Sequence, residues 1–146
     1  MRASEAPAPV AAARPGALRA LAGCAALMAL LILIQAALAG RFLAYSGEAR
    51  AADLQRLHGY LGNAVFLLAL VQVGLVVWAG IVGRARGTLL GTTILVLVLV
   101  TAQIGLGYAG RENAFPASLH LPNGVLLFGL SMATISLALR ARRGRA

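Results

Sequence analysis

The sequence predicts an all-α membrane protein: an antiparallel four-transmembrane-helix bundle built from two helical hairpins, with both termini in the cytoplasm. Four long stretches contain no Asp, Glu, Lys or Arg, and about 20 mostly apolar residues suffice for a helix to cross a bilayer. Of the 146 residues, 60% are apolar and 12% are charged. This composition fits one membrane domain and excludes a soluble globular domain.

Charged residues bound each predicted span. The expected helices cover residues 18–40, 56–82, 87–109 and 117–140. Residues 1–17 are expected to form a disordered cytoplasmic tail, 18–140 the membrane domain and 141–146 a basic cytoplasmic tail. Ala37-Leu38-Ala39 resembles a signal-peptidase site, but the apolar stretch before it is longer than that of a signal peptide, so we expect the first helix to be retained.

The last span contains a proline near its start. Pro122 would interrupt a helix interior because proline lacks a backbone N–H. Ser118 is a suitable N-cap, and a helix that begins there would tolerate Pro122. This start places His120 in the first helical turn.

The basic residues predict the orientation. All 13 are Arg, and nine of them flank the ends of the spans that would share a side with both termini, against one acid. The first and third connections hold four Arg and three acids. The positive-inside rule therefore places both termini in the cytoplasm and predicts a multi-pass protein of the cytoplasmic (inner) membrane in contact with lipid. No basic face interleaved with aromatic residues is present, so nucleic-acid binding is not expected.

The two halves of the chain share a weak repeat. Gln35 and Gln103 each precede a run of small residues that ends in Ala-Gly-Arg, and a Leu-His pair follows each Arg. Both His residues are followed four positions later by Gly. Two hairpins of the same polarity would set His58 opposite His120 at a similar depth, near the outer surface.

This pair of histidines predicts a cofactor site. An ionisable side chain inside a membrane helix indicates a functional site, and imidazole is an axial ligand of haem iron. Gly62 and Gly124, one turn inward, would leave room for a porphyrin. Arg41 and Arg111 lie at helix ends where they would pair with haem propionates, and Gln103 lies deep enough to approach the haem edge.

Other interpretations of the histidines stay open. Each could be a packing residue that hydrogen-bonds to a neighbouring helix. A zinc site would need further ligands beside two His. A proton relay would lack a partner, because no carboxylate lies inside any predicted span.

The residues around both histidines resemble one four-helix half of the haem A synthase family. The resemblance covers about 20–140 and rests on LHGYLGNAVFLL, QIGLG and LHLPNGVLLFGL. It implies that His58 and His120 are axial ligands, and that Gln103, Leu106 and Gly107 match a family motif. Gln55 stands where the family has a catalytic Glu, and only one bundle is present, so synthase activity is not expected. Small four-helix cytochromes of the b type share the pattern.

The sequence thus predicts a metal-binding, cytochrome b-like membrane protein that binds haem b through His58 and His120. Its expected role is electron transfer or haem handling near the outer face, with a redox partner or a quinone, and the chain is a candidate homodimer. The alternative is a cofactor-free membrane subunit or interaction protein. In that case the Gly residues serve only helix packing.

Overall fold

Four long helices make up the protein. The computed structural model describes residues 14–80 and 83–143. Within them lie α1 (Pro15–Ala44), α2 (Ala49–Trp78), α3 (Gly83–Ala109) and α4 (Ala114–Arg143). All four are long and apolar enough to cross a membrane. The chain is a multi-pass integral membrane protein with four candidate spans, and the predicted all-α four-helix bundle is confirmed.

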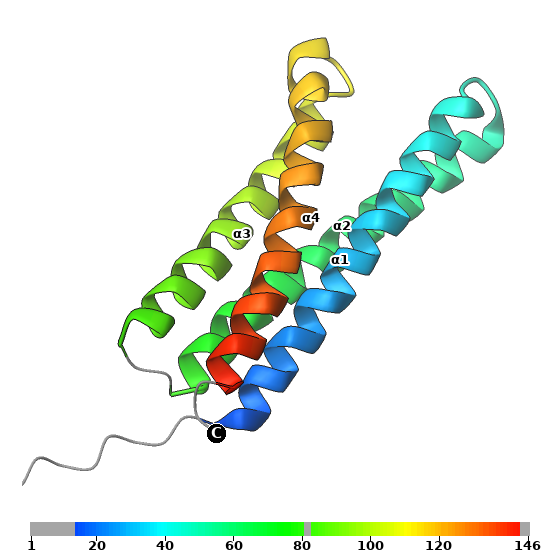
Figure 1. Ribbon diagram of the computed structural model, residues 1–146. Helices are drawn as coiled ribbons and strands as arrows, with labels where there is room; N and C mark the ends of the chain where they lie inside the picture. The colour runs from blue at the N-terminus through cyan, green and yellow to red at the C-terminus, as the bar shows by residue number, and fades with distance from the viewer. Residues whose placement is uncertain (1–13, 81–82, 144–146) are drawn as a thin grey trace, which may run out of the picture.

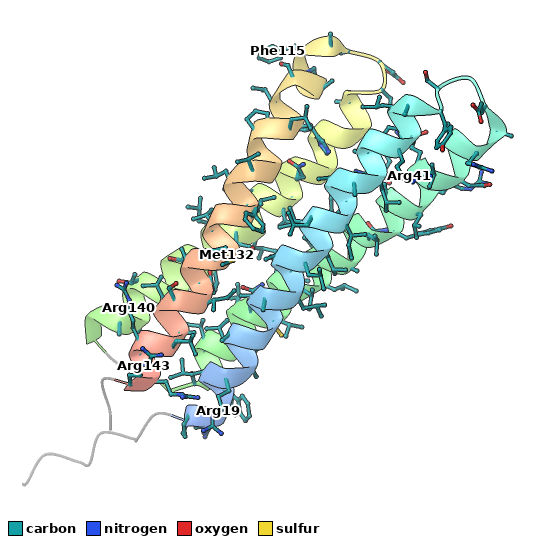
Figure 2. The ribbon with its side chains drawn as sticks, turned by 45° about the vertical axis from the view of Figure 1, so that its right-hand side comes forward. Arg19, Arg41, Phe115, Met132, Arg140 and Arg143 are labelled. Carbon is teal, nitrogen blue, oxygen red and sulfur yellow. The ribbon has the colours of Figure 1, made fainter. Side chains whose placement is uncertain are left out.

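The helices form a closed ring of neighbours (Figure 1). α1 packs on α2 and α4, and α3 packs on the same two helices, whereas the diagonal pairs α1–α3 and α2–α4 make no close backbone contact. The α1–α2 and α3–α4 loops lie at one end, hereafter the loop end. The starts of α1 and α3 and the ends of α2 and α4 lie at the other, the terminal end. Arg19 and Arg143 are at the terminal end, and Arg41 and Phe115 are at the loop end (Figure 2).

The bundle is closely packed from the terminal end to its middle. One apolar cluster at the terminal end includes Leu18, Leu21 and Leu89. A second, nearer the middle, includes Met28 and Val96. A layer of buried polar residues lies between the two clusters. Its members come from α2, α3 and α4 and are Gln72, Thr93, Ser131 and Thr134. The hydroxyl groups donate to carbonyls of their own helices, which satisfies them without a partner helix.

Gln72 is the exception in this polar layer. Its side chain is fully buried, and its Nε2 donates only to Met28 Sδ at 3.4 Å. Its Oε1 has no hydrogen-bond partner among the described residues. A buried acceptor without a donor destabilises the folded state.

Gln72→Met is therefore expected to stabilise the protein. Methionine has a similar volume and removes the unpaired oxygen, so the free energy of unfolding should rise by about 1 kcal/mol. The midpoint of thermal unfolding in detergent measures this. Gln55→Met, at a half-buried position of the same helix, is the control and should change the midpoint little. A lower midpoint for Gln72→Met would mean that Oε1 is bonded in the native protein.

The helix ends differ from the predicted boundaries. α1 begins at Pro15, a residue that suits the first helical turn, so the helix takes in residues 15–17 of the expected tail. Residues 1–13 of that tail and 144–146 of the C-terminal tail lie outside the described residues, and α4 extends to Arg143. α2 begins at Ala49, seven residues before position 56. An Asp53–Arg56 ion pair within its first turns supports this longer helix.

The predicted start of the last span is wrong. α4 begins at Ala114, because the side chain of Asn113 accepts a hydrogen bond from the Phe115 N–H at 2.9 Å and so caps the helix. Ser118 is inside the helix, where its hydroxyl donates to Phe115 O. His120 consequently lies in the second turn, and Pro122 is in the helix interior. Helices in a bilayer tolerate such a proline when the freed backbone groups find other partners.

The α3–α4 turn depends on Gly110. A Cβ added there would lie 2.8 Å from Leu106 O and 3.1 Å from the Cα of Ala117. Gly110→Ala should therefore lower the free energy of unfolding by about 1–2 kcal/mol, because backbone atoms must move. Gly40 is the matching glycine of the other hairpin, and its Cβ would meet nothing within 4 Å. Gly40→Ala should leave the unfolding midpoint unchanged or raise it slightly, and equal effects of the two variants would contradict the contact.

Candidate functional site

The two histidines meet across the bundle. His58 comes from α2 and His120 from α4, which are diagonal helices. Their ring centroids are 6.1 Å apart and their planes are tilted by 48°. Both rings are half-buried. The structure thus brings together the two residues that the repeat pairs, although they are 62 positions apart in the sequence.

A backbone carbonyl orients each ring. His58 Nδ1 lies 3.1 Å from Gln35 O on α1, and His120 Nδ1 lies 3.1 Å from Gln103 O on α3. A carbonyl only accepts, so each Nδ1 carries the proton and donates. Each Nε2 then keeps its lone pair and has no hydrogen-bond partner among the described residues. This is the tautomer in which an imidazole coordinates a metal through Nε2, with its orientation fixed by the other nitrogen.

The separation of the rings suits one metal ion between them. Two metal–imidazole bonds of about 2 Å each, extended to the ring centres, put the centroids about 6 Å apart. No third His, Cys, Asp or Glu joins the pair in the described part of the chain. The donor set is therefore two neutral imidazoles. It is too small for a closed tetrahedral zinc site, and it matches the two axial positions of a haem iron.

Gln103 links α3 to α4 beside His120. Its Nε2 donates to the His120 carbonyl at 2.9 Å, and its Oε1 accepts from Asn123 Nδ2 at 2.6 Å. Asn123 Nδ2 also lies 3.0 Å from Leu99 O. Gln103 was expected to approach a haem edge. In the structure its side chain contacts the backbone of His120 and the side chain of Asn123 on α4.

The glycines of the site take different roles. A Cβ at Gly62 would lie 3.7 Å from Gln35 Oε1, and one at Gly124 would lie 3.3 Å from Gln103 Nε2. The space beside these two predicted glycines thus holds the glutamine side chains. Gly107 is the glycine that lies closest to a histidine ring, since a Cβ added there would lie 3.1 Å from His120 Cε1. Gly105 faces open space, with nothing within 4 Å.

The arginines expected beside the site are exposed at the loop end. The Arg41 guanidinium lies 5.5 Å from the Tyr45 ring centre and donates to its hydroxyl. The Arg111 guanidinium lies 4.9 Å from the Tyr108 ring centre. These cation–π contacts keep both charges near the mouth of the bundle. Neither guanidinium forms an ion pair with a carboxylate of the described segments.

Packing becomes looser around the histidines. The buried residues of α1 end at Ala29, those of α2 begin at Val65 and those of α4 begin at Leu127. On these three helices no described residue nearer the loop end is buried, and the last buried residue of α3 is Val100. Beyond this level the α1–α2 and α3–α4 hairpins diverge (Figure 1). A flat group held between the histidines would lie where the helices have separated.

Two kinds of contact at the site have little or no signal in the sequence. The first is the hydrogen bond from each histidine to a backbone carbonyl, which only the repeated placement of Gln35 and Gln103 indicates. Phe42 packs edge-on against His58 with ring centroids 5.7 Å apart. The residue that corresponds to Phe42 in the second hairpin is Glu112, so the repeat does not indicate a contact between Phe42 and His58.

No protein-family model, curated protein or solved structure matches this chain.

Proposed function

We propose that this chain is a haem-binding integral membrane protein, with His58 and His120 as the two axial ligands of a single haem b. One observation carries the proposal: two imidazoles on diagonal helices have centroids 6.1 Å apart, and each has its Nδ1 committed to a backbone carbonyl. Two packing histidines would have no need of this matched arrangement. The loose packing at the loop end supports the same reading.

The other predicted residues have parts in this site. Gln35 and Gln103 orient the ligands through their carbonyls, and Gly107 allows His120 to lie close to α3. Arg41 and Arg111 are candidates to pair with propionates, because they lie at the loop end and no carboxylate of the described residues neutralises them. Arg56 is a weaker candidate, since Asp53 already pairs with it.

The distribution of charge supports an orientation. Arg14, Arg19, Arg140, Arg142 and Arg143 lie at the terminal end without an acid among the described residues there. The loop end mixes Arg with Glu48, Asp53 and Glu112. By the positive-inside rule the termini face the cytoplasm and the histidines lie near the outer face of the cytoplasmic (inner) membrane.

The role that fits this site is electron transfer or haem handling. A haem with two protein ligands exchanges one electron between its ferrous and ferric states. The chain's contribution is to fix both imidazoles, exclude water from one side through the apolar middle of the bundle, and leave the other side near the surface. Gln55 cannot act as the carboxylate that the haem A synthase family places one turn before its first histidine, so the resemblance extends to haem binding and not to synthesis.

The test is an absorption spectrum of the detergent-purified chain, expressed with added haem, before and after reduction by dithionite. We expect about one haem per chain and, on reduction, a sharp Soret band with split α and β bands, as for six-coordinate low-spin haem. The His58→Ala/His120→Ala double variant should lose these bands. Arg14→Ala is the control at the terminal end, where Arg14 contacts Trp78, and should keep them.

The contrary result is equally clear. A folded chain that takes up no haem from a haem-supplied host would contradict the proposal. The site would then be a packing contact in a cofactor-free membrane subunit. A spectrum that survives in the double variant would contradict the assignment of the ligands.

A further inference from the structure

The two histidines are held unequally. His120 is tied to α3 through its ring and through its backbone, because Nδ1 donates to Gln103 O while Gln103 Nε2 donates to His120 O at 2.9 Å. Asn123, one turn further along α4, then fixes the Gln103 amide and reaches Leu99 O. Gly107 contacts the ring from the same helix. His120 is therefore tied to α3 both by its ring and by the backbone that carries the ring.

His58 lacks most of these ties. Its ring donates to Gln35 O at 3.1 Å and meets the edge of Phe42. The position that corresponds to Asn123 is Leu61, three residues past His58 as Asn123 is past His120, and leucine cannot donate to an amide. The Gln35 side-chain amide forms no hydrogen bond with any described residue, whereas that of Gln103 forms two. His58 is thus tied to its neighbouring helix by one hydrogen bond.

We infer that His58 is an exchangeable ligand and His120 a permanent one, so that the protein has a binding site for a small neutral ligand of ferrous haem iron on the His58 side. This inference rests on the proposed function. With haem bound, one bond from the iron to His58 Nε2 would break and one bond to the incoming ligand would form. No proton or electron would be transferred, because the incoming ligand is neutral and His58 would keep its Nδ1 proton. The three additional hydrogen bonds between α3 and α4 hold the backbone that carries His120, so we expect His120 to be retained in preference to His58.

Single glycine variants test the asymmetry. His58→Gly should keep at least half of the haem of the parent chain, show a five-coordinate spectrum, and recover a six-coordinate one when imidazole is added. His120→Gly should lose most of its haem under the same purification. Equal retention by the two variants, or retention by His120→Gly alone, would overturn the inference.

A second measurement avoids any loss of folding. Carbon monoxide is titrated into the reduced parent chain and into Phe42→Leu and Asn123→Leu, all of which keep both histidines. Phe42→Leu should raise the affinity for carbon monoxide several-fold, because it removes the ring that packs on His58. Asn123→Leu, which loosens only the His120 side, should change the affinity less than twofold. The reverse order would overturn the inference, as would a parent chain that binds haem but no carbon monoxide.

Haem uptake separates this inference from the proposed function. A parent chain without haem refutes the proposed function before any variant is compared. A parent chain with a six-coordinate spectrum whose two glycine variants behave alike refutes only the inequality of the ligands.

Discussion

Gly107→Val should strongly weaken haem binding while leaving the four helices intact. The first atom of the new side chain would lie 3.1 Å from Cε1 and 3.4 Å from Nδ1 of His120, and the two methyl groups of valine add further bulk beside that atom. The imidazole must tilt away from Gln103 O and out of line with His58. Overpacking of this kind costs about 1–3 kcal/mol, which predicts a fall in haem affinity of about 10- to 100-fold.

Gly105→Val is the matched control for this substitution. Gly105 lies two residues away on the same helix, and its Cβ would meet nothing within 4 Å. Both variants add the same side chain and impose the same change in helix propensity. Titration of the two apo proteins with haem, followed at the Soret band, compares them directly. If both variants lose haem alike, the effect lies in α3 as a whole and not in the contact with His120.

Gln103→Leu should weaken both the fold and the site. The substitution removes the donor to His120 O and the acceptor of Asn123 Nδ2, two bonds that join α3 to α4. Bonds between membrane helices contribute about 0.6 kcal/mol each, and a buried polar group left without a partner costs about 1–3 kcal/mol more. The free energy of unfolding should therefore fall by about 2–4 kcal/mol, and haem should dissociate faster.

Gln35→Leu supplies the comparison within the same chain. Gln35 has the corresponding place in the first hairpin, and it orients His58 only through its backbone carbonyl, which leucine retains. Its variant should unfold near the parental midpoint and keep its haem. Thermal unfolding in detergent and transfer of haem to an excess of apomyoglobin measure the two quantities. Similar losses in both variants would mean that the Gln103 side chain has no special role.

The spans and the meeting of the two histidines could be predicted from the sequence because each has a strong and simple physical cause. Long uncharged stretches can satisfy their backbone groups in a bilayer only as helices. His58 and His120 are the only histidines of the chain, and the repeat places both at one depth. The prediction that they face one another required only that the two hairpins run in the same direction across the membrane.

The finer structure of the site could not be predicted in the same way. The start of α4 was a competition between Asn113 and Ser118 as caps, and local sequence does not decide between two good caps. The carbonyls of Gln35 and Gln103 carry no side-chain signal. Gly62 and Gly124 have the same spacing from their histidines, yet which glycine contacts a ring depends on the rotation of α3, which brings Gly107 to His120.

The two histidines are held by different numbers of hydrogen bonds, which is possible because both hairpins belong to one polypeptide. The two hairpins supply one imidazole and one orienting carbonyl each, so two copies of a single hairpin would make an equivalent pair. A symmetric dimer must hold both rings alike, because any residue placed beside one ring also appears beside the other. Covalent fusion removes that constraint. In this chain Asn123 lies in one half and Leu61 at the corresponding position of the other. One histidine can therefore be held more tightly than the other.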